Sequence, residues 1–148
     1  MDRMDSISDY MANDHRACDN LFAVAEESVA NGKWPQAQAQ FDAFRSEVER
    51  HFALEEDVLF PAFDAKTGMD MGPTYVMRSE HVQMRKLFDD MARQVGAKDR
   101  DGYLGTSETL MILTQQHNMK EEQMLYRMMD QTFGAEGRDL LQRAGVAA

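Results

Sequence analysis

Two short stretches of this chain, HFALEE at residues 51–56 and HNMKEE at residues 117–122, place a histidine four positions before a pair of glutamates. Residues four apart lie on the same face of a helix, so each stretch presents an imidazole beside a carboxylate. Imidazole and carboxylate donors with open coordination positions suit iron, and also manganese or zinc. The two stretches therefore predict a metal site.

The spacing of the histidines indicates an internal repeat. The chain has four histidines, which are His15, His51, His81 and His117. A shift of 66 residues, from 15 to 81 and from 51 to 117, superimposes the first two on the last two and Glu55 on Glu121. Repetition at a fixed period means that one structural unit is used twice. We therefore expect a helical hairpin in two copies, each supplying two histidines and one glutamate.

The elements that must position these residues are long helices. Ala, Glu, Gln, Met and Leu are plentiful, and only three prolines and nine glycines interrupt the chain, which favours helix over sheet. Glycine and proline residues mark the joints between the segments. We predict helices over about 8–31, 35–66, 73–97 and 103–132 and a short amphipathic helical tail near 136–143. Pro61 should kink or locally break the second helix, because it removes a backbone donor.

The apolar spacing within these helices follows the three-and-four step of a helix bundle. In the second helix the predicted buried stripe continues from Glu55 to Val58 and Ala62, and in the fourth it continues from Glu121 to Met124 and Met128. One histidine lies on the stripe of each helix. The sequence therefore predicts an all-α fold, an antiparallel up-down-up-down four-helix bundle that forms a single domain over residues 1–148.

A bundle of this kind would bury two carboxylates and four imidazoles. A buried carboxylate costs free energy unless something pairs with it, and the apolar stripes offer no other partner. A pair of metals, each with two imidazoles and both bridged by two carboxylates, would use every donor. The alternative is a hydrogen-bonded polar layer without metal. The predicted metal-binding residues are His15, His51, Glu55, His81, His117 and Glu121.

Charge and composition exclude several function classes. The formal net charge of −10 argues against nucleic acid or an anionic membrane as a partner. The single cysteine, Cys18, excludes an intramolecular disulfide, and no apolar run or signal region is present, so we expect a cytoplasmic protein. No histidine lies three residues after a glutamate, which disfavours the ferritin-like di-iron class. No His-Glu-x-x-His zinc-protease motif occurs either.

The combined pattern resembles the hemerythrin-like family, also called the HHE cation-binding domain, from about residue 8 to residue 130. The resemblance is carried by the stretches DHRACDNLF, HFALEEDVLFP, EHVQMRKLF and HNMKEEQMLY. It implies a four-helix bundle with a non-haem centre of two Fe ions. By resemblance, Glu55 and Glu121 would bridge the irons together with an oxo or hydroxo group, and the histidines would be terminal ligands.

One position departs from the oxygen-carrying hemerythrins, which have a further histidine four residues after the one equivalent to His81. This chain has Arg85 there, so it is similar to the four-histidine branch of the family. Fewer protein ligands leave positions for dioxygen, nitric oxide or peroxide. We expect a sensor, carrier or stress-response protein for such a molecule. The alternatives are a di-iron oxidase or peroxidase, or an iron-handling or iron-centre repair protein; the sequence identifies no protein partner.

Several neighbours of the predicted ligands have more than one interpretation. Arg85 could pair with an acid such as Asp89 one turn on, or reach an open iron site and stabilise a bound anion. Glu56 and Glu122 are expected to be solvated or to lie just outside the metal ligands. Phe60 and its equivalent in the second copy, Tyr126, are expected to be packing residues.

Overall fold

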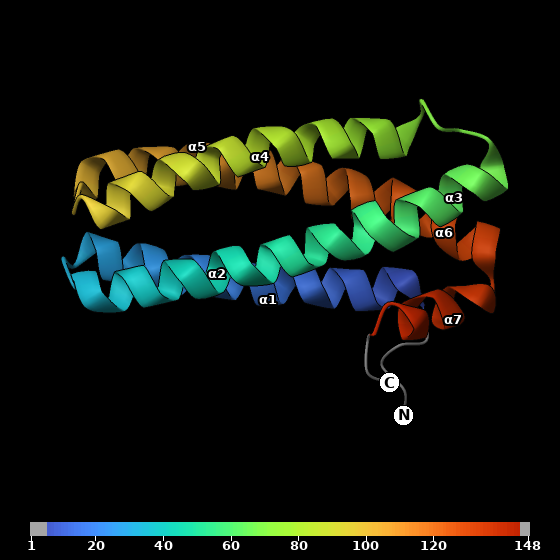
Figure 1. Ribbon diagram of the computed structural model, residues 1–148, viewed down its shortest axis with the longest axis horizontal. Helices are drawn as coiled ribbons and strands as arrows, with labels where there is room; N and C mark the ends of the chain where they lie inside the picture. Colours follow the sequence, from blue (N-terminus) through green and yellow to red (C-terminus); the bar gives the residue numbers. More distant parts are fainter. Residues whose placement is uncertain (1–5, 146–148) are drawn as a thin grey trace.

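The chain folds into an α-helical bundle. The structure, a computed structural model, describes residues 6–145. Figure 1 shows long helical runs side by side along one axis, with no strand among the described residues, which confirms the prediction of an all-α bundle. The elements are α1 (Ile7–Ala30), α2 (Trp34–Leu54), η1 (Glu55–Leu59), α3 (Phe60–Thr67), α4 (Pro73–Gly96), α5 (Arg100–Lys120), η2 (Glu121–Leu125), α6 (Tyr126–Phe133) and α7 (Glu136–Arg143). No helix in residues 6–145 is long and apolar enough to span a membrane.

Local sequence sets the helix ends. The Ser6 side chain accepts a hydrogen bond from the Asp9 backbone N–H and caps α1. Gly68 ends α3 with φ of 74°, a left-handed conformation that glycine adopts without steric cost. The Asp99 side chain accepts from the Gly102 N–H, so α5 begins at Arg100 rather than near residue 103. Short connections join α1 to α2 and α4 to α5, forming two hairpins.

The second helix of each hairpin contains one widened turn. Helix α2 continues through the π turn η1 into α3, and α5 continues through η2 into α6. The backbone N–H of residue 60 bonds to the Glu55 carbonyl, and that of residue 126 bonds to the Glu121 carbonyl. The irregularity in the first copy therefore precedes Pro61. Proline is not its cause, because the second copy has the same turn with Arg127 at the equivalent position.

The widened turns change which residues face the core. The predicted stripe after each turn is wrong: Val58, Ala62 and Met128 are only partly buried, and Met124 is 54% exposed. A π turn holds one extra residue, so every later side chain is rotated by about 100° relative to an uninterrupted α-helix. The residues buried instead are Leu59, Phe60, Phe63, Leu125, Tyr126 and Met129.

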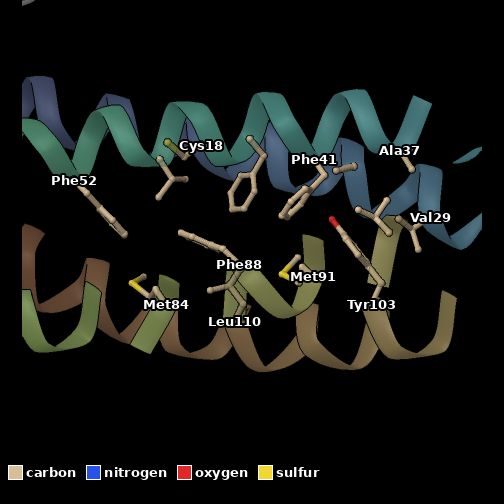
Figure 2. Close-up of a cluster of buried hydrophobic side chains, with 14 residues drawn as sticks. Cys18, Val29, Ala37, Phe41, Phe52, Met84, Phe88, Met91, Tyr103 and Leu110 are labelled. Atoms are coloured by element: carbon tan, nitrogen blue, oxygen red, sulfur yellow. The ribbon is translucent and has the colours of Figure 1, made fainter. Parts of the chain in front are cut away.

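Two apolar clusters fill the bundle, one on each side of the histidine positions. The first lies toward the α1–α2 and α4–α5 connections and includes Phe41, Phe88 and Leu110, as Figure 2 shows. The second lies toward α3 and α6 and includes Phe63. Helix α7 contributes the buried Leu141 to this second cluster, so the predicted tail packs on the bundle. The polar layer between the clusters is thereby shielded from water along the bundle axis.

Candidate metal centre

The six predicted metal-binding side chains meet in the layer between the two apolar clusters, and none is more than 5% exposed. The ring centroids of His15 and His51 are 4.7 Å apart, and those of His81 and His117 are 5.0 Å apart. The donor atoms form two groups, each with all its atoms within 4.8 Å of one another. The groups share Glu121 and consist of Glu55, His81, His117 and Glu121, and of His15, His51 and Glu121.

Several donor atoms in this layer have no hydrogen-bond partner. His81 Nε2 lies 3.1 Å from Glu55 Oε1 and His51 Nε2 lies 3.7 Å from the same oxygen. Among the described residues, the Nε2 atoms of His51, His81 and His117 and one oxygen of each inner glutamate make no hydrogen bond. Buried polar atoms without partners are rare because they cost free energy. A converging set of nitrogen and oxygen donors in this condition fits a metal cation.

A second set of carboxylates holds the outer nitrogen of each histidine. A neutral imidazole has one N–H, and a carboxylate at Nδ1 keeps the proton there, so that Nε2 presents its lone pair to the centre. Each of the four long helical runs of the bundle supplies one of these carboxylates. The Nδ1–oxygen pairs are His51–Asp14 at 2.6 Å, His81–Glu56 at 2.6 Å, His117–Glu80 at 2.7 Å and His15–Glu122 at 2.7 Å.

Sequence reasoning found only half of these outer acids. Glu56 and Glu122 were expected to be solvated or to lie outside the ligands, and the structure places both on histidines. Asp14 and Glu80 were missed. The shift of 66 residues relates Asp14 to Glu80, and each directly precedes a histidine. The internal repeat was therefore the sequence pattern that could have identified both acids.

Basic side chains lie behind three of the four outer acids. Arg50 Nη2 donates to Asp14 over 2.6 Å, Arg85 Nη1 donates to Glu56 over 2.8 Å, and Lys120 donates to Glu80. Arg85 pairs with acids, as one interpretation predicted, but its partners are Glu49 and Glu56, whereas Asp89 is bound by Arg45. Arg85 contacts Glu49 and Glu56 and so contacts the histidine layer through Glu56.

Glu80 shows how these contacts act on an outer acid. Burial opposes ionisation of Glu80, but hydrogen bonds from Lys120 and His117 outweigh it and lower the pKa of the carboxyl. The acid therefore remains an acceptor that fixes the His117 proton at Nδ1 and raises the basicity of Nε2. Glutamine at this position would accept a weaker hydrogen bond.

We expect Glu80→Gln to lower metal affinity roughly 10–100-fold, the usual effect of removing an acid that orients a histidine ligand. Competition with a chelator of known affinity measures the change. Glu108→Gln removes the same charge from an exposed position on α5 and should leave affinity unchanged. Equal affinities for the two variants would show that Glu80 does not support the donor set.

The inner acids and histidines divide charge unevenly. Burial and the charge of Glu121 raise the pKa of Glu55 well above its usual range. Burial also opposes ionisation of Glu121, but the charge of His117 outweighs it and lowers the pKa of Glu121 well below its usual range. Burial opposes protonation of His117, yet Glu121 raises its pKa to about 9, whereas burial and the charge of His117 lower the pKa of His81 to about 4. These shifts favour the neutral forms of Glu55 and His81 and the charged forms of Glu121 and His117.

Tyr126, which we expected to be a packing residue, lies at the centre of the layer. Its hydroxyl oxygen is 2.6 Å from Glu55 Oε2, 2.7 Å from Glu121 Oε1 and 3.2 Å from His15 Nε2. A phenol has one proton and can donate to only one carboxyl. The other contact requires a proton on the carboxyl, which agrees with a neutral Glu55. Burial and the two acids raise the pKa of Tyr126 well above its usual range, so the phenol stays protonated.

We expect Tyr126→Phe to destabilise the protein by about 1–3 kcal/mol, because two buried carboxyl groups lose a partner. Packing should tolerate phenylalanine, since Phe60 occupies the equivalent buried position in the first copy. Urea denaturation followed by circular dichroism measures the difference. Tyr10→Phe is the control, because the Tyr10 hydroxyl makes only a 3.4 Å contact with Arg50. If both variants lose the same stability, the Tyr126 hydroxyl has no special role.

Comparison with known proteins gives one match. The family model described as Hemerythrin HHE cation binding domain matches residues 6–129, a span that contains every residue of the layer. No curated protein and no solved structure matches the chain.

Proposed function

Since the chain belongs to the hemerythrin HHE cation-binding family, we propose that it is a non-haem di-iron protein of the four-histidine branch that binds dioxygen, nitric oxide or peroxide. In this proposal His15 and His51 would hold one iron, His81 and His117 would hold the other, and Glu55 and Glu121 would supply carboxylate oxygens to them. The whole chain acts as one such domain. The role we favour is that of a sensor, carrier or stress-response protein.

The observation that carries the proposal is the set of buried donor atoms that face one another without hydrogen bonds. Ferrous iron bound there would supply the electrons and open coordination positions that a diatomic or peroxide ligand needs. The protein supplies the rest. The outer acids hold the imidazole protons at Nδ1, and the apolar clusters on both sides shield the layer along the bundle axis.

A sensing role follows from how strongly this layer depends on its partners. Glu55 and Glu121 are fully buried, and loss of a bound cation would leave their charges to be balanced by protons and by the neighbouring His15 and His117. Metal binding is therefore coupled to the packing of the helices that carry these residues.

The alternative is a di-iron oxidase or peroxidase, and one observation favours it. The Tyr126 hydroxyl is a proton-bearing group within 2.7 Å of both inner acids. A reaction that consumes protons at the centre could take one from this hydroxyl.

Metal analysis of protein purified from its own host, followed by anaerobic reduction and a visible spectrum in air, tests the proposal. We expect close to two irons per chain and charge-transfer bands that form on exposure to air. Bands that reverse under vacuum indicate a carrier, whereas bands that persist favour a sensor or an enzyme. His117→Ala should lose the bands, and Asp70→Asn, a loop variant far from the layer in sequence, should keep them. Zinc alone, or no metal, would overturn the proposal.

A further inference from the structure

The two copies of the hairpin meet along two seams that differ in sequence. The shift of 66 residues relates the seam between α1 and α5 to the seam between α4 and α2. Ion pairs close the α2–α4 seam: Arg85 reaches Glu49 and Glu56, and Arg45 reaches Asp89. Two identical copies would make the same pairs in the other seam.

The α1–α5 seam lacks these pairs. Asp19 stands at the position equivalent to Arg85, and Met111 at the position equivalent to Arg45. Among residues 6–145, no salt bridge joins α1 to α5. The ring of Phe52, which stacks on His81 at 3.8 Å in the closed seam, is replaced by Asn118 in this one. The substitutions remove both the cations and the aromatic cover.

A pocket of about 260 Å³ opens in the α1–α5 seam. Its inner end is formed by His15 and His51, so it reaches the histidine layer. Phe44 and Phe88 line it and are buried, whereas Asp19 lines it and is exposed. The pocket therefore has an apolar interior and an acidic mouth. Figure 2 shows Phe88 and neighbouring apolar side chains projecting into the space between the helices.

The mouth carries two acidic side chains that form no ion pair with a lysine or arginine in the described chain. Asp19 and Glu26 both line the pocket from α1, two helical turns apart on one face. Neither forms an ion pair within residues 6–145; Glu26 only accepts a hydrogen bond from Ser107 over 2.6 Å. Such a mouth repels carboxylates and attracts cations. The phenylalanine rings inside attract apolar bodies and, with Asp19, a nearby ammonium group.

We propose that this pocket binds a small amine with an apolar body, its ammonium group at Asp19 and Glu26 and its body against Phe44 and Phe88, directly above His15 and His51. The volume, below the roughly 300–1,000 Å³ of drug-sized sites, limits the ligand to a small molecule. The inference deepens the proposed function, because the pocket ends at two of the proposed iron ligands.

Calorimetric titration of the metal-loaded protein with 2-phenylethylamine tests this assignment. We expect the amine to bind at least tenfold more tightly than 2-phenylethanol and 3-phenylpropanoate to show no binding. Asp19→Asn should weaken amine binding about tenfold. Asp19→Arg, which copies the closed seam, should abolish it. Asp70→Asn is the matched control and should bind like the unmodified protein.

Equal affinity for the amine and the alcohol, or unchanged amine binding in Asp19→Asn, would overturn the inference. The measurement needs no oxygen chemistry, so the two proposals can fail separately. Asp19-dependent amine binding in protein that takes up no iron would overturn only the di-iron proposal. Air-sensitive iron bands in protein that does not bind the amine would overturn only the amine-binding proposal.

Discussion

Replacing Glu121 with methionine is expected to abolish metal binding and to destabilise the metal-free protein by about 3–5 kcal/mol, the usual cost of removing one partner of a buried ion pair. Glu121 belongs to both donor groups, so neither position keeps its full set. In the metal-free layer its charge supports protonated His117, whose Nε2 lies 3.3 Å away and whose pKa is raised to about 9. Methionine would leave that cation buried alone or force it to lose its proton.

Glu55→Met is the matched control for this prediction. It removes the other inner carboxylate, which belongs to one of the two donor groups, and should also weaken metal binding. Glu55 is neutral in the metal-free layer, because burial and Glu121 raise its pKa. Its replacement removes one hydrogen bond to Tyr126 and should cost only about 0.5–1.5 kcal/mol. Urea denaturation of both chelator-treated variants near pH 7 measures the difference. Equal losses of stability would contradict the uneven division of charge between the two acids.

Removing the metal from the unmodified protein is expected to lower its thermal unfolding midpoint by roughly 8–16 °C. Metal at a thousandfold excess over its dissociation constant adds about 4 kcal/mol of stability, and a domain of this size shifts by about 2–4 °C per kcal/mol. The effect arises because only the folded chain brings the unpartnered donors together. Scanning calorimetry before and after chelation measures it.

Two controls accompany the chelation experiment. Glu121→Met should show no shift with chelator, because it has no metal to lose. Anaerobic return of ferrous iron should restore the midpoint of the unmodified protein. A midpoint that chelation leaves unchanged would mean that the polar layer is stable by itself, as in a bundle held by hydrogen bonds alone.

The sequence was sufficient to predict which inner residues would meet. His15 and Glu55 lie far apart in the chain, but each recurs at a fixed shift, and the helical spacing assigns both to an inward face. The fold class followed from the same periodicity. The positions after Glu55 and Glu121 could not be predicted in this way. A π turn leaves the sequence apparently α-helical while rotating everything that follows it, so Met124 was assigned to the core and Tyr126 was not assigned to the site.

Other features were hidden for a different reason. The outer acid Asp14 was missed because the two copies were compared only for the residues that they share. Glu80 occupies the equivalent position in the second copy. Where the copies differ, as at Asp19 and Arg85, the effect of the difference depends on the side chains of the helix packed against that position. That neighbour is set by tertiary packing, which local sequence does not specify.

The two widened turns bear on the ancestry of the chain. Each begins at the inner glutamate and ends at a leucine, Leu59 in one copy and Leu125 in the other. The same insertion at the same place in both halves is what duplication of a single hairpin that already carried it would produce. Such a hairpin, with two histidines and one inner glutamate, would complete the layer only by pairing with a second copy of itself around a two-fold axis. In such a homodimer both seams would have one sequence. Fusion into one chain would then let the seams differ, with arginine closing one and aspartate in the other.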